Sequence, residues 1–451
     1  MKNNIHLSLG FDMPNLTPYL QFQSKRKSLW YNITRYFLRY IMSLLLVFLT
    51  TYASHVFALP NAYFTNAQDN TISVIDTSTN TIIATIPSFP SQGPNGIAAT
   101  PDGAFVYVSN SNPSSNNISV IDTNTNTLVG SPISVGVFPI GIAFTPDGAF
   151  AYVANFGDNN VYRINTTSNT VVGAPISVGD APSIIAITPD GKFAYVTNED
   201  SNNVSVINTT SNTVINTITV GTTPAAVAIT PDGKFAYISN NGANTVSVID
   251  TTSNTVVDTV AVGNGPLDLA ITPNGSFVYV PNLIDGTVSV IRTSDNTVIS
   301  TITVGATDIQ VAITPDSAFA YVTNHDSNTI SVIDTSTNTV IDTITGGGSP
   351  VGITIASNST LPPASFKGNV AKLRFLTQTD RIHKLYWTAS PGPNVIGYNL
   401  YRNGILIYTV GVSGPFSYND NNRHNNVVDT YELTAFNSSL IESTELIITL
   451  K

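Results

Sequence analysis

A short segment in which tyrosine is followed by Val, Ile or Phe, then by one further residue and Asn, recurs seven times along this chain. The seven tyrosines are spaced by 44, 45, 43, 42, 42 and 42 residues and are Tyr63, Tyr107, Tyr152, Tyr195, Tyr237, Tyr279 and Tyr321. A fixed period of this length, built from short β-type runs, predicts a β-propeller assembled blade by blade. The repeat constrains the fold far more than it constrains the chemistry.

Each repeat contains four predicted strands. In one copy the mostly apolar run 225–230 predicts a strand buried on both faces, and Pro231-Asp232-Gly233 predicts a turn. The segments 235–240, 246–250 and 255–262 predict the second, third and fourth strands. Four antiparallel strands in one repeat correspond to one propeller blade.

The two ends of the repetitive region complement each other. First strands are predicted to begin near Gly96, Gly141, Ile184, Ala226, Asp268, Gln310 and Gly352. The segment at Tyr63 has no such strand before it, and strand 351–356 has no tyrosine segment after it. We therefore expect strand 351–356 to pair with the strands of residues 61–87 and to close a ring of seven blades. Closure removes the exposed sheet edges that invite aggregation.

The chain begins with an expected export signal. Basic residues from Lys25 to Arg39 precede the apolar run Ile41 to Tyr52 and the small-residue site Val56-Phe57-Ala58. This order is typical of a secretory signal, here residues 1–58, cleaved before Leu59. An uncleaved membrane anchor and a translation start at Met42 are the alternatives. The mature protein is expected in the periplasm, at the cell surface or in the medium.

Composition limits the partners of the mature chain. Without residues 1–58 it carries 12 Lys and Arg against 27 Asp and Glu, a net charge of −15. Such a surface repels phosphate backbones, so no nucleic acid is expected. A membrane is expected as a partner only through an uncleaved N-terminal segment. Cysteine is absent, so the hydrophobic core must hold the fold without disulfides.

Two motifs link the repeats to a known family. Thr-Pro-Asp-Gly opens four copies, at Thr100, Thr145, Thr188 and Thr230, and Tyr-Val-Thr-Asn occurs unaltered at Tyr195 and Tyr321. The chain therefore resembles the YVTN family of β-propeller repeats over about residues 61–356. This resemblance implies a seven-bladed ring like that of secreted and surface-layer propellers. It implies no activity, because propellers host many functions.

The region after the repeats predicts a second β unit. Residues 357–365 contain Leu361-Pro362-Pro363 and predict a stiff linker. Residues 366–451 resemble a fibronectin type III-like β-sandwich, in which Trp387 would be the core indole and Tyr431 the corner tyrosine. An Asn403-Gly404 pair predicts a tight hairpin turn between two of its strands.

A search for catalytic or metal-binding motifs finds little. In the mature chain the histidines are His325, His383 and His424, which are far apart in sequence. We therefore expect no metal and no cofactor. Four aspartates recur at one blade position, but other blades carry Asn or Arg there, so we expect these side chains to bond the following turn; they are Asp76, Asp122, Asp250 and Asp334.

The variable loops supply the candidate binding residues. Phe89, Phe138 and Phe156 are expected in neighbouring blades on one loop face, where exposed aromatic residues can anchor a partner. Leu283, Ile284 and His325 lie in equivalent loops and complete the candidate set. The alternative is that the aromatic rings pack under their own loops and that His325 is a solvated surface residue.

These observations favour an exported, non-enzymatic interaction protein that binds a protein or glycan of the cell envelope or of a host surface. One alternative is an enzyme resembling the lactonase-type propellers, with Asp268, Asp308 and Gln310 near the inner strands as its candidate residues. Nothing in the sequence visibly activates them. A structural component of a surface layer or envelope is the other alternative.

Overall fold

The computed structural model describes residues 60–88, 93–112, 115–356, 365–374, 379–388, 397–411, 417–423, 429–436 and 446–450. Every regular element in these ranges is a β-strand, so the all-β expectation is confirmed. No helix among the described residues is long and apolar enough to cross a membrane. The expected signal at 1–58 lies outside the described residues.

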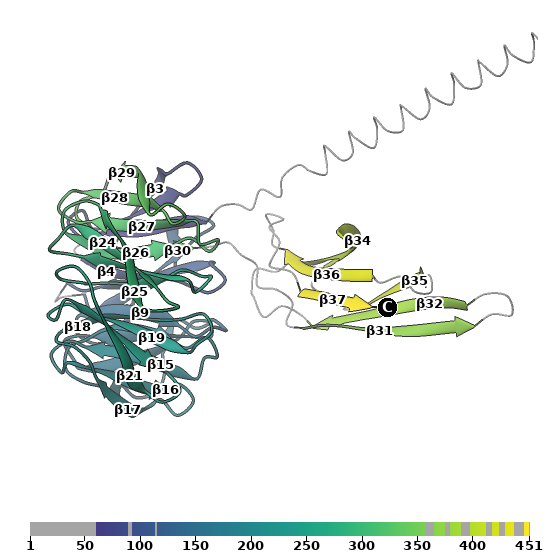
Figure 1. The fold of residues 1–451 in the computed structure, drawn as a ribbon, viewed down its shortest axis with the longest axis horizontal. Coiled ribbons are helices and arrows are strands. Elements are labelled where there is room, and N and C mark those ends of the chain that lie inside the picture. Colours follow the sequence, from purple (N-terminus) through teal and green to yellow (C-terminus); the bar gives the residue numbers. More distant parts are fainter. Residues whose placement is uncertain are drawn as a thin grey trace, which may run out of the picture. The chain divides into compact units, whose positions relative to one another are not determined.

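Residues 61–356 form seven antiparallel sheets, the blades of a propeller (Figure 1). In order from the inner to the outer strand, blade 1 consists of β30 (Pro350–Ala356), β1 (Asn61–Asn66), β2 (Thr71–Asp76) and β3 (Thr81–Pro87). Blade 2 consists of β4 (Pro94–Ala99), β5 (Phe105–Asn110), β6 (Asn117–Asp122) and two short outer strands, β7 (Thr127–Leu128) and β8 (Ile133–Ser134). Blade 3 has the same plan, with β9 (Pro139–Phe144), β10 (Phe150–Asn155), β11 (Asn160–Asn165), β12 (Thr170–Val171) and β13 (Ile176–Ser177).

The other blades have four strands each. Blade 4 consists of β14 (Pro182–Ile187), β15 (Phe193–Asn198), β16 (Asn203–Asn208) and β17 (Thr213–Thr219). Blade 5 consists of β18 (Pro224–Ile229), β19 (Phe235–Asn240), β20 (Thr245–Asp250) and β21 (Thr255–Ala261). Blade 6 consists of β22 (Ala270–Ile271), β23 (Phe277–Asn282), β24 (Thr287–Arg292) and β25 (Thr297–Thr303). Blade 7 consists of β26 (Asp308–Ile313), β27 (Phe319–Asn324), β28 (Thr329–Asp334) and β29 (Thr339–Thr345).

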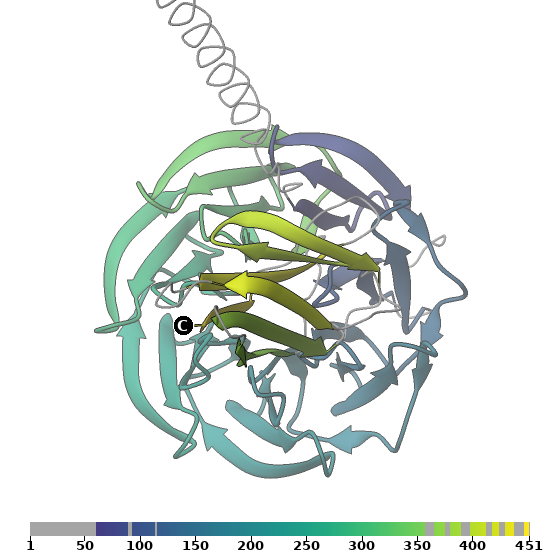
Figure 2. The ribbon, with the colours of Figure 1, turned by 90° about the vertical axis from the view of Figure 1, so that its right-hand side faces the viewer.

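The ring closes as the sequence predicts. Strand β30 pairs antiparallel with β1, with Ala356 opposite Asn61 and Ile353 opposite Phe64. In Figure 2 the purple first strands and the green last strands of the propeller lie next to each other in the ring. Blade 1 is therefore shared between the two ends of the repetitive region.

The repeated tyrosines join each blade to the next. Each tyrosine is buried, and its hydroxyl donates a hydrogen bond to the side-chain oxygen of an asparagine in the outer turn of the following blade. All seven of these asparagines have φ of 53° or 54°, a left-handed conformation that asparagine tolerates better than most residues. The bond from Tyr321 to Asn80, 2.7 Å long, joins blade 7 to blade 1. The seven pairs are Tyr63–Asn126, Tyr107–Asn169, Tyr152–Asn212, Tyr195–Asn254, Tyr237–Asn296, Tyr279–Asn338 and Tyr321–Asn80.

The propeller has two distinct faces. The crossing face carries the loops between second and third strands together with the connections between blades, and hydrogen bonds tie these segments together, as from Glu199 N to Ala181 O at 3.0 Å. The turn face carries the Thr-Pro-Asp-Gly turns and the turns between third and fourth strands. In the latter, the recurring aspartates bond the turn as expected; for example, Ser78 N donates to Asp76 Oδ1 at 2.8 Å.

Residues 365–450 add two further sheets. One contains β31 (Ser365–Arg374), β32 (Thr379–Thr388) and β35 (Ser417–Arg423), and the other contains β34 (Ile405–Gly411), β33 (Gly397–Arg402), β36 (Asp429–Phe436) and β37 (Leu446–Leu450). Trp387 and Tyr431 belong to one buried cluster between them. The hydroxyl of Tyr431 donates to Asp420 Oδ2 at 2.7 Å, whereas a corner tyrosine bonds the backbone. Positive φ values at Asn403 and Gly404 fit the predicted hairpin turn.

Candidate functional site

The third residue of each inner strand lies close to the inner strand of the next blade. Glycine occupies this position in three blades because a Cβ atom there would lie 2.1 to 2.4 Å from a backbone oxygen of the next blade; these glycines are Gly96, Gly141 and Gly352. Blades 6 and 7 carry Asp268 and Gln310 instead. Their side chains accept hydrogen bonds from the next blade, Asp268 Oδ2 from Val311 N at 3.0 Å and Gln310 Oε1 from Ile353 N at 3.1 Å. Two of the three residues considered for an enzyme thus lie at the axis of the ring.

Among the seven described inner strands, only that of blade 6 is reduced to two residues. In β22 Ala270 and Ile271 pair with β23, Pro266 forms an isolated bridge to Asn282, and Leu267 to Leu269 lie outside the ladder. Asp268 is in this irregular segment. Irregular backbone that holds an ionisable side chain is characteristic of functional sites.

The environment of Asp268 changes its acidity. The side chain is half-buried and burial raises its pKa to about 7, although the backbone N–H groups of Val311 and Leu269 oppose this rise. A carboxyl group with a pKa near neutrality can both accept and return a proton at pH 7, as general acid–base catalysis requires. Burial in the folded ring thus perturbs Asp268 in a way that no motif of the sequence indicates. The signal was not visible in the sequence because the desolvation comes from the folded ring.

A second carboxyl group with raised pKa lies at the crossing-face end of the inner strands. Glu199 follows β15, and burial raises the pKa of its carboxyl group, with a further rise from the charge of Asp200 and an opposing hydrogen bond from Ser183. Ser183 is the second residue of inner strand β14, so the Glu199 carboxyl group reaches toward the axis. Glu199 and Asp268 belong to blades 4 and 6, which are separated by one blade around the ring.

Glu199 is one of seven equivalent residues around the axis. Each follows the asparagine that ends a second strand, and they are Ala67, Ser111, Phe156, Glu199, Asn241, Leu283 and His325. Two of them bond the proline that begins the inner segment of the next blade: Ser111 Oγ donates to Pro139 O at 2.6 Å, and Asn241 Nδ2 donates to Pro266 O at 3.5 Å. Sequence reasoning missed Glu199, although comparing the seven blades at this position would have found it.

The predicted binding residues are only partly brought together. The rings of Phe138 and Phe156 lie 5.8 Å apart between centroids. Phe138 is in the connection from blade 2 to blade 3, and Phe156 follows β10 of blade 3. Ile284 is 74% exposed in blade 6, beside the half-buried Leu283. His325 is in blade 7, where its Nδ1 lies 2.8 Å from Asp326 Oδ1. Phe89 lies outside the described residues, as does the side chain of Asp308, whose backbone begins β26.

The turn face has a cavity of about 630 Å³ between blades 4 and 5, with Asp190, Asp232 and Asn254 in its wall. Lys192 and Lys234 each lie 2.8 Å from the neighbouring aspartate and, with other hydrogen bonds, hold the pKa of Asp190 and of Asp232 at about 2. Such carboxylates are poor bases at neutral pH. Asp268 and Glu199 are therefore the better acid–base candidates.

Across the described ranges, no group of three or more His, Asp or Glu side chains is arranged to hold a metal ion.

A family model described as a lactonase, seven-bladed β-propeller, matches residues 55–172 and 142–299, which together span more than half of the chain. No curated protein matches the sequence.

Solved propellers resemble the structure over about two thirds of this chain. Hydrazine synthase of Kuenenia stuttgartiensis is 23% identical with a TM-score of 0.55, and the match covers 64% of this chain and 97% of that one. A protein of Desulfotomaculum acetoxidans described as functionally unknown is 20% identical, with a TM-score of 0.58 and coverages of 66% and 98%. A Bacteroides uniformis protein proposed to be a 6-phosphogluconolactonase is 17% identical, with a TM-score of 0.57 and coverages of 66% and 99%. At these identities the likeness concerns the fold.

Proposed function

Because the chain belongs to the family of seven-bladed β-propeller lactonases, we propose that it hydrolyses lactones at the axis of the ring. The observation that carries this proposal is the half-buried carboxyl group of Asp268, whose pKa is raised to about 7 in the irregular inner segment of blade 6. Family membership overturns the expectation of a non-enzymatic interaction protein, which rested on the absence of familiar catalytic motifs. That absence was a weak argument, since hydrolysis of an activated ester requires little more than a placed base and a water molecule.

The proposed reaction uses Asp268 to move one proton. Its carboxylate accepts a proton from water while the water oxygen attacks the lactone carbonyl carbon. The ring C–O bond then breaks, and the Asp268 carboxyl group returns the proton to the departing alkoxide oxygen. The product is an open-chain hydroxy acid. Burial favours the protonated form of Glu199 by raising its pKa, and that form would donate a hydrogen bond to the carbonyl oxygen as negative charge develops on it.

The test is hydrolysis of a panel of lactones by the full-length protein, followed as proton release in a pH-stat. We expect turnover, and we expect Asp268→Asn to lower kcat by roughly 10²- to 10⁴-fold, the usual contribution of a general base. Asp342→Asn is the matched control, because Asp342 lies on outer strand β29 and its bond from Thr343 N survives the change. Turnover of no lactone, or an undiminished rate in Asp268→Asn, would contradict the proposal.

We also propose the domain division of the sequence analysis, with a cleaved leader at 1–58, the propeller at 59–356, a linker at 357–365 and a sandwich at 366–451. The tyrosine segments support membership of the YVTN repeat group within the lactonase family. The two C-terminal sheets around Trp387 support the fibronectin type III-like assignment.

Export to the periplasm, surface or medium follows from the leader, and N-terminal sequencing of protein recovered from cell envelope and medium tests it. A protein or glycan partner at the phenylalanine loops stays a prediction.

A further inference from the structure

Basic residues of the propeller are few, and all lie toward the turn face. Residues 61–356 contain four Lys and Arg residues. Lys192 and Lys234 are in turns between first and second strands, each in an ion pair with an aspartate. Arg292 ends β24 and lies 2.6 Å from Asp295. Arg163 is placed over the ring of Phe150, the first residue of β10, with its guanidinium carbon 4.5 Å from the ring centroid.

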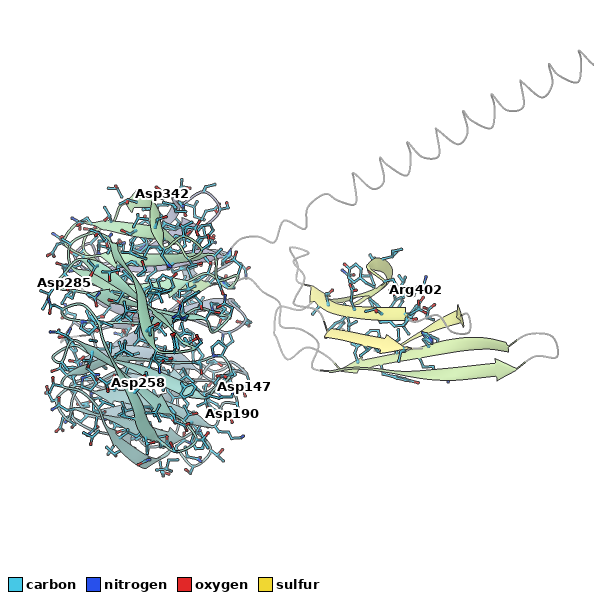
Figure 3. The ribbon with its side chains drawn as sticks, viewed as in Figure 1. Asp147, Asp190, Asp258, Asp285, Asp342 and Arg402 are labelled. Atoms are coloured by element: carbon cyan, nitrogen blue, oxygen red, sulfur yellow. The ribbon has the colours of Figure 1, made fainter. Side chains whose placement is uncertain are left out.

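The crossing face is acidic as well, but its loops contain no Lys or Arg. Besides Glu199, six described acidic residues lie in its loops and blade connections, and they are Asp69, Asp158, Asp180, Asp200, Asp285 and Asp326. The sequence places no Lys or Arg in any of these segments. Figure 3 shows Asp285 on the side of the propeller opposite to Asp147 and Asp190, which belong to the turn face.

Local hydrogen bonds favour the ionised form of two of these carboxylates, Asp285 and Asp326. The backbone and side-chain N–H groups of Asn264 hold the pKa of Asp285 below its ordinary value. The Thr307 hydroxyl and His325 do the same for the pKa of Asp326. Asp158 accepts a hydrogen bond from Val137 N at 2.8 Å. A molecule that approaches Asp268 and Glu199 from this face therefore meets several fixed negative charges and no Lys or Arg.

From the unopposed negative charge of the crossing face, and on the premise that the proposed lactonase function holds, we infer that the substrate is an uncharged lactone. Phosphorylated and other anionic lactones are disfavoured by the acidic crossing face. The negative charge of the crossing face also favours product release, because hydrolysis converts a neutral ring into a hydroxy acid, which is a carboxylate at neutral pH. The face that admits the substrate then repels the product. Like charges around a cleft change the rate of encounter by about 10- to 1,000-fold at low salt.

A matched pair of substrates tests the inference: an aldonolactone and the same lactone carrying a 6-phosphate. With the full-length protein at low ionic strength, we expect kcat/KM to be at least about tenfold higher for the uncharged member. Because salt screens such fields over a Debye length of about 8 to 10 Å near physiological ionic strength, the ratio should shrink as salt is added.

A charge-reversal variant sharpens the test. Asp200→Lys adds a positive charge on the crossing face beside Glu199 and should raise the rate for the phosphorylated lactone at least about threefold relative to the uncharged one. Asp342→Lys makes the same charge change on the outer strand of blade 7 and should leave the ratio unaltered. Equal or faster hydrolysis of the phosphorylated lactone would overturn the inference while leaving the lactonase proposal intact. Hydrolysis of neither member, nor of any other lactone, would overturn both.

Discussion

Replacement of Asp268 by asparagine should stabilise the propeller at alkaline pH while it lowers activity. In the folded protein the pKa of this carboxyl group is about 7, above its ordinary value of 3.8. The folded state therefore binds the proton more tightly than the unfolded state. The contribution of Asp268 to stability is complete below about pH 4 and is lost as pH rises through 7. Ionisation of Asp268 thus opposes folding above neutrality.

The size of the effect follows from that difference in pKa. It corresponds to about 4 kcal/mol of free energy of unfolding between the fully protonated and fully ionised states. Asparagine cannot ionise and retains an oxygen for the N–H of Val311. It loses the second acceptor oxygen near Leu269 N, at a cost of about 1 kcal/mol. Asp268→Asn should therefore be about 3 kcal/mol more stable than the wild type at pH 8 and slightly less stable at pH 4.

Urea unfolding at the two pH values measures the difference. The propeller contains no tryptophan, whereas Trp387 lies in the C-terminal sheets, which also contain tyrosines. Tryptophan fluorescence therefore reports unfolding of the C-terminal sheets, and a tyrosine near-UV circular dichroism transition at a different urea concentration reports unfolding of the propeller. A shift of the midpoint with an unchanged m value reports stability.

Gln310→Glu provides the converse variant, because Gln310 occupies the same position in blade 7 and accepts the N–H of Ile353. It should destabilise the propeller at pH 8 more than at pH 4. If Asp268→Asn changes stability equally at both pH values, or lowers it at pH 8, the reasoning from burial is wrong.

Four further variants test other parts of the argument. Tyr321→Phe leaves the side-chain oxygen of Asn80 without its donor and should lower the free energy of unfolding by about 1 to 2 kcal/mol in urea titrations. Gly352→Ala places a methyl group 2.3 Å from a backbone oxygen of blade 2, and should lower the thermal midpoint through a loss of about 1 to 3 kcal/mol. Glu199→Gln should lower kcat at least about tenfold in steady-state kinetics, since a neutral amide is a poorer donor than a carboxylic acid. Pro281→Thr should extend the inner strand of blade 6 and reduce turnover, as measured by amide hydrogen exchange at residues 267–269 and by kcat.

The fold was predictable from the sequence because each blade is specified by local chemistry repeated seven times. The Tyr and Asn positions, the Pro-Asp-Gly turns and the apolar first strand all agree within one repeat. Ring closure followed from counting, since blade 1 lacks its inner strand at one end of the chain and finds it at the other. Agreement among such local signals is what makes a sequence specify one structure.

The site was less predictable because its properties arise between blades. Asp268 was recognisable as an inner-strand carboxyl group, but its raised pKa depends on packing in the folded ring and its hydrogen bond on Val311 in blade 7. Glu199 reads as an ordinary loop residue until the residues after the seven Tyr-x-x-Asn segments are compared. The phenylalanines were chosen as candidates because large aromatic side chains can anchor a partner. The raised pKa at the axis depends instead on how deeply a carboxyl group is buried in the folded ring, which residue type does not reveal.

The irregular segment around Asp268 has a cause in the sequence itself. In four other blades a Ser or Thr near the end of the second strand accepts the N–H of the third inner-strand residue, as Ser239 Oγ does from Ala226 N at 2.9 Å. Blade 6 carries Pro281 at that position. Blade 3 also lacks the hydroxyl, at Ala154, yet β9 is continuous, so the missing acceptor alone does not break the strand. Proline additionally lacks an N–H and has a fixed φ, and we attribute the break to this combination. The one blade that departs from the repeat in this way is also the one that presents a carboxyl group with a pKa of about 7 to the axis.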